Sequence, residues 1–122
     1  MPLRFLLDEN GRGPIWDAIR SHNAKGIDPI DALRVGDPRD LPLGTTDPEV
    51  LLWAEREDRI LISYDKNTMP GHLDNHLLRG NHSPGLLLVR DTVPLSQVVA
   101  HLAILAHASD PWEWADRMDF IP

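Results

Sequence analysis

The sequence of 122 residues has no cysteine, no long apolar run and no excess of basic charge. Without cysteine it forms no disulfide and no thiolate metal site, which favours the cytoplasm as its compartment. No apolar run approaches the roughly 20 residues that cross a bilayer, and no segment is typical of a signal peptide, so we expect no membrane partner. The net charge of −7 argues against nonspecific charge attraction to nucleic acid. It leaves a nuclease open, because acids around a metal ion count towards that total.

The rest of the sequence fits a single domain over residues 1–122, in which strand-like and helix-like segments alternate. Strands are expected at 3–7, within 26–35, at 60–64, at 85–90 and, as an edge strand, within 117–122. Helices are expected at 15–21, from 46 or 47 to 56, and from 95 to 105. Thr46 and Glu49 have the spacing of a capping box, and Asp47 followed by Pro48 is an alternative start for the second helix.

Near-continuous apolar strands that alternate with helices predict an α/β fold with a parallel sheet covered on both faces. The carboxyl ends of parallel strands share one edge of the sheet, and ligands of open α/β folds bind outside that edge. Two predicted strands end in acids, Asp8 and Asp65, and Asp47 or Glu49 at a helix start can reach the same crevice. Gathered carboxylates repel one another unless their pKa values rise or a cation binds. Oxygen ligands of this kind suit Mg²⁺ or Mn²⁺. Each acid taken alone is also an ordinary turn or cap residue.

Four short segments, FLLDEN, TDPEVLLWA, RILISYDKNT and GLLLVR, follow one another over nearly the whole chain. Their order and spacing resemble the small single-domain PIN-like proteins, which are relatives of PIN-domain ribonucleases and include many toxins of bacterial toxin–antitoxin pairs. The resemblance implies a three-layer α/β/α sandwich with a central, mostly parallel sheet. It also implies a Mg²⁺- or Mn²⁺-dependent endoribonuclease, with RNA as substrate and, for a toxin, a cognate antitoxin protein as partner.

By position in this resemblance, Asp8 and Asp65 match the acids that end the first and third strands, and Asp47 matches the acid that opens the middle helix. These three would be the metal ligands and catalytic residues for hydrolysis of RNA phosphodiesters, in which a metal activates water and offsets charge on the phosphate. Glu9 or Glu49 would orient the attacking water. Three further residues would hold the ligands in place or contact the phosphate: Asn10, Lys66 and Asn67.

Two alternatives to an active nuclease stay open. Asn67 and Thr68 stand where such proteins often have a second acid and an aromatic residue, as in DKDF, and an amide brings no charge. This departure favours the first alternative, a PIN-like binding module that has no catalytic activity. Alternatively, DKNTMPG resembles the phosphoacceptor region of receiver domains, which need a lysine after the last strand. The only lysines are Lys25 and Lys66, which disfavours that reading.

Aromatic and histidine residues outside these motifs are interpreted as structural. Trp112, Trp114 and Phe120 near the end of the sequence predict a segment that closes the core or contributes to a homodimer. His72 and His76 have the spacing of a helical zinc site, but no HExxH glutamate accompanies them, so a surface helix is expected.

The position of Asp65 also predicts its energetics. Without metal, it is expected to suffer desolvation and repulsion from a neighbouring carboxylate. Asp65→Asn is therefore expected to leave the metal-free fold as stable as before, or more stable by up to roughly 1–2 kcal/mol. The same change is expected to remove both metal-dependent cleavage of RNA and the rise in melting temperature that Mn²⁺ gives.

Overall fold

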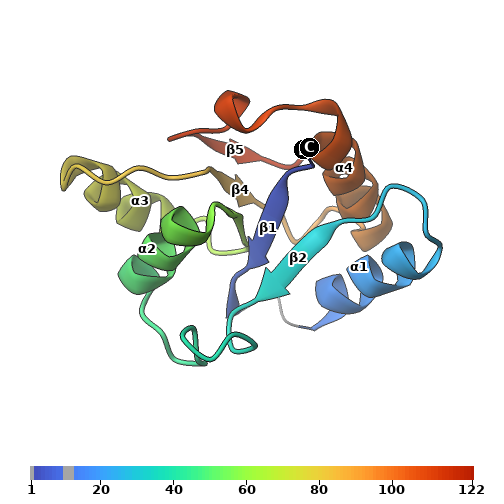
Figure 1. Ribbon diagram of the computed structural model, residues 1–122, viewed down its shortest axis with the longest axis horizontal. Helices are drawn as coiled ribbons and strands as arrows, with labels where there is room; N and C mark the ends of the chain where they lie inside the picture. The colour runs from blue at the N-terminus through green and yellow to red at the C-terminus, as the bar shows by residue number, and fades with distance from the viewer. Residues whose placement is uncertain (1, 10–12) are drawn as a thin grey trace.

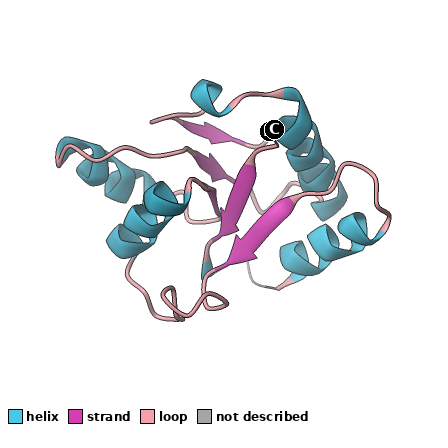
Figure 2. Ribbon diagram, viewed as in Figure 1, coloured by secondary structure: helices cyan, strands magenta, loops and turns pink. Residues whose placement is uncertain are grey.

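The computed structural model describes residues 2–9 and 13–122, in which five strands and four α-helices alternate (Figure 1, Figure 2). In chain order, the elements are β1 (Arg4–Leu7), α1 (Pro14–Ala24), β2 (Asp31–Arg34), α2 (Asp47–Glu57), β3 (Ile60–Ser63), α3 (Met69–Leu78), β4 (Leu86–Leu88), α4 (Leu95–Ala108), the short 3-10 helix η2 (Pro111–Glu113) and β5 (Met118–Phe120).

The five strands form one parallel sheet in the order β2-β1-β3-β4-β5. β3 and β4 are buried along their whole length, which explains why both consist of nearly continuous apolar residues. The edge strands β2 and β5 are partly exposed and accordingly mix polar with apolar residues.

Helices cover both faces of the sheet in pairs, and each pair seals its own apolar core (Figure 1). α1 and α4 pack on one face against Phe5, Leu7 and Ile62, whereas α2 and α3 pack on the other against Leu6 and Leu61. Successive side chains of a strand point to opposite faces, so β1 and β3 contribute to both cores. The predicted three-layer α/β/α sandwich is confirmed.

The strand order reverses between β1 and β3. The chain adds β2 on one side of β1 and then adds β3, β4 and β5 on the other. In open α/β sheets, the carboxyl ends of the two strands at such a reversal border a crevice where ligands bind. Leu7 pairs with Ile62 near the ends of these two strands, so the chain after each strand enters the same crevice.

The last crossover differs in hand from the first three. α1 covers one face on the step from β1 to β2, and α2 and α3 cover the other face on steps in the opposite direction, so these connections share one hand. α4 lies on the α1 face, although the step from β4 to β5 runs in the direction of the α2 and α3 steps. Because right-handed crossovers are the rule, β4-α4-β5 is the left-handed exception.

Two local predictions need correction. Thr46 is the N-cap of α2, but in the described structure its side chain makes no capping hydrogen bond, so the capping box with Glu49 does not form. Pro48 in the first turn fixes the helix start instead. α3 carries both predicted helical histidines, yet His76 is only 5% exposed, so the surface position predicted for His76 is wrong.

The aromatic residues near the end of the chain divide into two groups. Trp114 packs against the α1–α4 core and Phe120 against the α2–α3 core, which confirms that this segment closes the core. Trp112 is 76% exposed and takes no part in that closure. None of the helices formed by residues 2–9 and 13–122 is long and apolar enough to cross a membrane.

Candidate active site

Ser63 connects the two strand-ending acids at the crevice between β1 and β3. The backbone N–H of Asp8 donates to the carbonyl of Ile62 at 2.9 Å, which continues the pairing of β1 with β3. The Ser63 hydroxyl donates to Asp8 Oδ2 at 2.8 Å and accepts the backbone N–H of Asp65 at 3.0 Å. Because Ser63 is fully buried, it fixes both acids relative to the end of β3.

Asp8 is a buried carboxyl group, only 5% exposed. Burial is the main cause that raises its pKa above the ordinary value. The Ser63 hydroxyl and the Glu9 N–H, which donates to Oδ1 at 2.7 Å, offset part of this effect. The negative charges of Asp47 and Asp65 raise the pKa further. The three predicted carboxylates therefore lie close enough to affect one another, and the effect is seen in the raised pKa of Asp8.

Asp65 lies in a different environment from the one predicted. Its carboxylate accepts hydrogen bonds from the Thr68 hydroxyl, from the Thr68 N–H at 3.0 Å and from the Asn67 N–H at 3.2 Å. These donors, the Thr68 hydroxyl foremost, lower the pKa of Asp65, and the nearby His72 lowers it further. Burial still raises the pKa of Asp65, and its charge repels that of Asp8, as expected, but the donors of the turn that Asp65 starts outweigh these effects.

His72 is a neighbour of the acids that the sequence pattern did not identify. It lies one turn into α3, and its Nε2 is 3.4 Å from Asp47 Oδ2 at the start of α2. The packing of α3 against α2 produces this contact. A signal for it was present in the sequence, since a histidine follows Asp65 by seven residues, but only the strand order shows which helices meet.

His76 belongs to another network despite its position four residues from His72. Its Nε2 lies 2.7 Å from the carbonyl of His82 and 2.9 Å from Glu55 Oε1. The two histidines therefore contact different partners, and they do not form a shared zinc site in the described chain.

The remaining predicted residues lie around the acids in three ways. Glu9 accepts the Gly44 N–H at 2.7 Å and so holds the loop before α2 against the end of β1. Glu49 lines a shallow hollow together with Thr45 and other residues beside α2. The side chains of Lys66 and Asn67 are exposed next to Asp65, and neither has a polar partner among the described residues. Asn10 lies outside the described residues.

The donor chemistry of this site fits a hard divalent cation. Asp8, Asp47 and Asp65 offer carboxylate oxygens, the ligands that Mg²⁺ and Mn²⁺ prefer, and a cation would relieve the repulsion that raises the pKa of Asp8. Within residues 2–9 and 13–122, however, no group of three or more histidine, aspartate or glutamate side chains is already placed to hold a metal ion. Binding therefore requires these side chains to turn towards one another.

Comparisons of the chain with protein-family models, with curated proteins and with solved structures found no match. The resemblance to PIN-like proteins therefore stays a prediction. The arguments for function rest on the crevice itself.

Proposed function

We propose that the chain is a Mg²⁺- or Mn²⁺-dependent ribonuclease of PIN-like type that hydrolyses RNA phosphodiesters at Asp8, Asp47 and Asp65. The observation that carries this proposal is the buried Asp8 at the strand-order reversal, with two further carboxylates near enough to raise its pKa. The ionised Asp8 adds no stability in the absence of a cation, because burial and the two neighbouring carboxylates disfavour its charge. Perturbed carboxyl groups at a ligand-binding crevice are typical of functional sites.

The residues divide the work of hydrolysis. Ser63 holds Asp8 and the turn after β3 holds Asp65 beside the same crevice, and Asp47 reaches it from α2. A cation would draw these carboxylates out of their present hydrogen bonds and towards one another. When bound, the metal ion lowers the pKa of a coordinated water and offsets the negative charge that develops on the phosphate. Glu9, which accepts the Gly44 N–H beside Asp8, or Glu49 in the first turn of α2 would orient that water.

Contacts to RNA come from cations along the same edge of the sheet. Lys66 is exposed beside Asp65 and supplies an ammonium group to a phosphate. Arg34 ends β2 and Arg90 follows β4, so both leave the sheet at its carboxyl edge. Arg90 lies 4.1 Å from the centre of the half-buried Phe120 ring, and its outer face is available for stacking with a base.

The biological setting of the proposal follows from the resemblance. As the toxin of a toxin–antitoxin pair, the protein acts on RNA in the cytoplasm and is held inactive by a cognate antitoxin protein. The absence of cysteine is consistent with that compartment. A homodimer that uses the exposed Trp112 is the alternative assembly.

Two other functions each have one observation in their favour. The order β2-β1-β3-β4-β5 is also that of flavodoxin-like folds, which favours a phosphoacceptor domain with Asp65 as acceptor. No lysine follows β5 to pair with a phosphoryl group. A binding module without activity is favoured because both Asp65 oxygens already accept hydrogen bonds.

A cleavage assay on single-stranded RNA with Mn²⁺, Mg²⁺ or EDTA tests the proposal. The native protein is expected to cleave only with metal, and Asp8→Asn and Asp47→Asn are each expected to lower the rate at least about 100-fold. Asp74→Asn is the control, because Asp74 is exposed on α3 and has no polar partner in the described chain. It is expected to retain activity.

Thermal melts of the same proteins give an independent reading of metal binding. Mn²⁺ is expected to raise the melting temperature of the native protein and of Asp74→Asn, but not of Asp8→Asn. Absence of both cleavage and metal stabilisation in the native protein would reject the nuclease. In that case, mass spectrometry after incubation with acetyl phosphate distinguishes a phosphoacceptor at Asp65 from an inactive module.

A further inference from the structure

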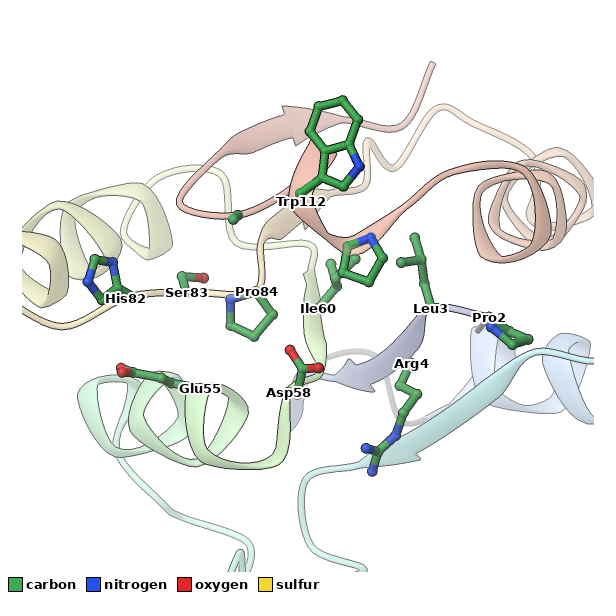
Figure 3. Close-up of a pocket in the computed structure, with 12 residues that line it drawn as sticks. Pro2, Leu3, Arg4, Glu55, Asp58, Ile60, His82, Ser83, Pro84 and Trp112 are labelled. Atoms are coloured by element: carbon green, nitrogen blue, oxygen red, sulfur yellow. The ribbon is translucent and has the colours of Figure 1, made fainter.

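The edge of the sheet opposite to the acids carries a hollow of about 400 Å³ (Figure 3). It lies beside the amino ends of β1 and β3, and its lining is mostly apolar, with Leu3, Ile60, Pro84 and Trp112 among its residues. This volume falls within the range of roughly 300–1,000 Å³ that is usual for ligand sites. None of the residues proposed for the nuclease lines it, so its role is a separate question.

The walls of this amino-edge groove are held rigidly. Asp116 accepts the Ser83 N–H at 2.7 Å through Oδ1, and Oδ2 lies 2.9 Å from His82 Nδ1. The Asp116 N–H in turn donates to the Ser83 carbonyl at 2.8 Å. Gly85 approaches the Trp114 backbone so closely that a Cβ atom would lie 3.0 Å from its carbonyl oxygen. The groove therefore exists before any partner binds, which lowers the entropic cost of binding.

Trp112 is exposed and contributes to neither apolar core. It lies in η2, immediately after Pro111, and a capping box between Asp110 and Glu113 fixes that short helix. The ring is 76% exposed and stands on one side of the groove (Figure 3). A large exposed aromatic side chain on a fixed backbone beside an apolar hollow is the usual anchor of a binding surface.

The other side of the groove is negatively charged. Glu55 and Asp58 line it from the end of α2, where the helix dipole already favours a cation (Figure 3). The Asp58 carboxylate has no hydrogen-bond or ion-pair partner within the described part of the chain. Arg4 also lines the groove, but its Nε pairs with Asp31 at 3.7 Å and does not neutralise Asp58.

We propose that this groove binds a short segment of a partner protein in which a large apolar side chain adjoins an arginine or lysine. The apolar side chain would lie between Trp112 and Pro84, and the cation would reach Asp58, because Glu55 Oε1 already lies 2.9 Å from His76 Nε2. Negatively charged groups and nucleic acid are disfavoured by these two acids. A second copy of the chain is disfavoured as well, because both copies carry a net charge of −7 and a symmetric contact would bring the acids together.

Selection from a displayed library of random heptapeptides on the full chain tests this proposal. The recovered peptides are expected to share an arginine or lysine next to a large apolar residue. Synthetic copies of them are expected to bind at least about tenfold more weakly to Trp112→Ala and to Asp58→Asn. Both residues are on the surface, and circular dichroism verifies that each variant is folded.

Asp65→Asn is the matched control, because it removes one carboxylate at the opposite edge of the sheet. It is expected to bind the peptides as the native protein does. The proposal is overturned if no shared sequence is recovered, if the recovered peptides are acidic, or if Trp112→Ala and Asp58→Asn bind unchanged. A dimer in solution that Trp112→Ala dissociates would also overturn it, since the occupant is then a second copy.

Discussion

The two edges of the same sheet are built in opposite ways. At the carboxyl edge, three carboxylates lie within electrostatic reach, and the buried Asp8 is held with its pKa raised. At the amino edge, the charged Asp116 is satisfied by His82 and by a backbone N–H, and its pKa is lowered. The carboxyl edge therefore retains one unfavourable buried charge, that of Asp8, whereas the charge of Asp116 at the amino edge holds two loops together.

This difference shows which charged groups lower the stability of the fold and which raise it. A buried carboxylate whose pKa is raised, such as Asp8, reduces stability at neutral pH, whereas a carboxylate with donors around it, such as Asp116 or Asp65, contributes stability. Substitutions at the amino edge should accordingly lower the free energy of unfolding more than those at the carboxyl edge. The four predictions below test that expectation, in order of decreasing effect.

The largest effect is expected for Gly85→Ala at the amino edge. Gly85 has φ of +136°, and an added Cβ atom would meet the Trp114 carbonyl oxygen at 3.0 Å and the Trp114 Cβ at 3.1 Å. We expect a loss of about 2–4 kcal/mol in the free energy of unfolding, measured by urea denaturation. Gly71→Ala is the control, because that glycine lies in α3 with nothing within 4 Å of the added atom. It should be neutral or stabilising by up to about 1 kcal/mol. Equal effects at both positions would contradict the close approach.

Asp116→Ala is expected to have the next largest effect. Asp116 has φ of 59°, so alanine there suffers backbone strain and also leaves the Ser83 N–H without its acceptor. Asp28→Ala isolates the strain, because Asp28 has φ of 47° and its side chain has no polar partner in the described chain. Asp116→Ala should cost about 1–2 kcal/mol more than Asp28→Ala in urea denaturation.

The His82–Asp116 pair also predicts a dependence on pH. The hydrogen bond and the charge of Asp116 raise the pKa of His82 above its ordinary value. The stability contributed by the protonated His82 is therefore complete below that ordinary value and is lost as the pH rises through the raised pKa. Asp116→Ala should lack this loss, and an identical pH profile in both proteins would contradict the role of the pair.

A smaller contrast is expected between two acids of the carboxyl edge. Asp65→Asn should lower the free energy of unfolding by about 1 kcal/mol, because Asp65 caps the turn before α3. Asp8→Asn should be neutral or stabilising by up to about 1 kcal/mol at neutral pH, because it removes a buried charge. Thermal and urea unfolding of both variants without metal give the comparison.

The effects of these two substitutions on stability should depend on pH in different ways. The raised pKa of Asp8 means that its destabilising charge is lost as the pH falls through that pKa, so the advantage of Asp8→Asn disappears in acid. The lowered pKa of Asp65 means that its stabilising charge persists until the pH falls below the ordinary value. Parallel pH profiles for the two variants would show that the acids share one environment.

The smallest effect is expected for His72→Asn, which should raise the pKa of Asp65 slightly towards its ordinary value. His72 is the weakest of the influences that lower this pKa, and the Thr68 donors remain in the variant. Titration of the Asp65 carboxyl group by NMR measures the shift. His101→Asn on α4 is the control and should leave it unchanged. An unaltered titration in His72→Asn would remove this histidine from the site.

The sequence predicted the strands and the parallel sheet well because buried parallel strands are continuous apolar runs. Residues 60–62 and 86–88 are recognisable without any tertiary information. The strand order was not predictable, because it depends on which strand pairs with which and not on local pattern. That order decides which acids meet. The shared crevice of Asp8, Asp47 and Asp65 was predicted, but the hydrogen bonds that hold Asp8 and Asp65 were not.

The environments of single residues were harder to predict than their positions. Asp8 and Asp65 look equivalent in the sequence, yet only Asp65 is followed by a turn that supplies hydrogen-bond donors. Pro70 suits the start of α3 as Pro48 suits that of α2, but Gly71 in the next position weakens the helical pattern, so this start was missed. The amino-edge groove is lined by segments that are far apart in the chain, so the sequence pattern did not predict it.

The left-handed connection through α4 has a consequence for synthesis of the protein. The N–H of Leu3, just before β1, donates to the Ala106 carbonyl in the last turn of α4. The first strand therefore cannot complete its contacts until one of the last helices has been synthesised. Until α4 leaves the ribosome, the apolar face of Phe5 and Leu7 is covered on one side only by α1. A nascent chain with such an open face is a substrate for chaperones, and a stalled chain that ends before α4 is expected to aggregate.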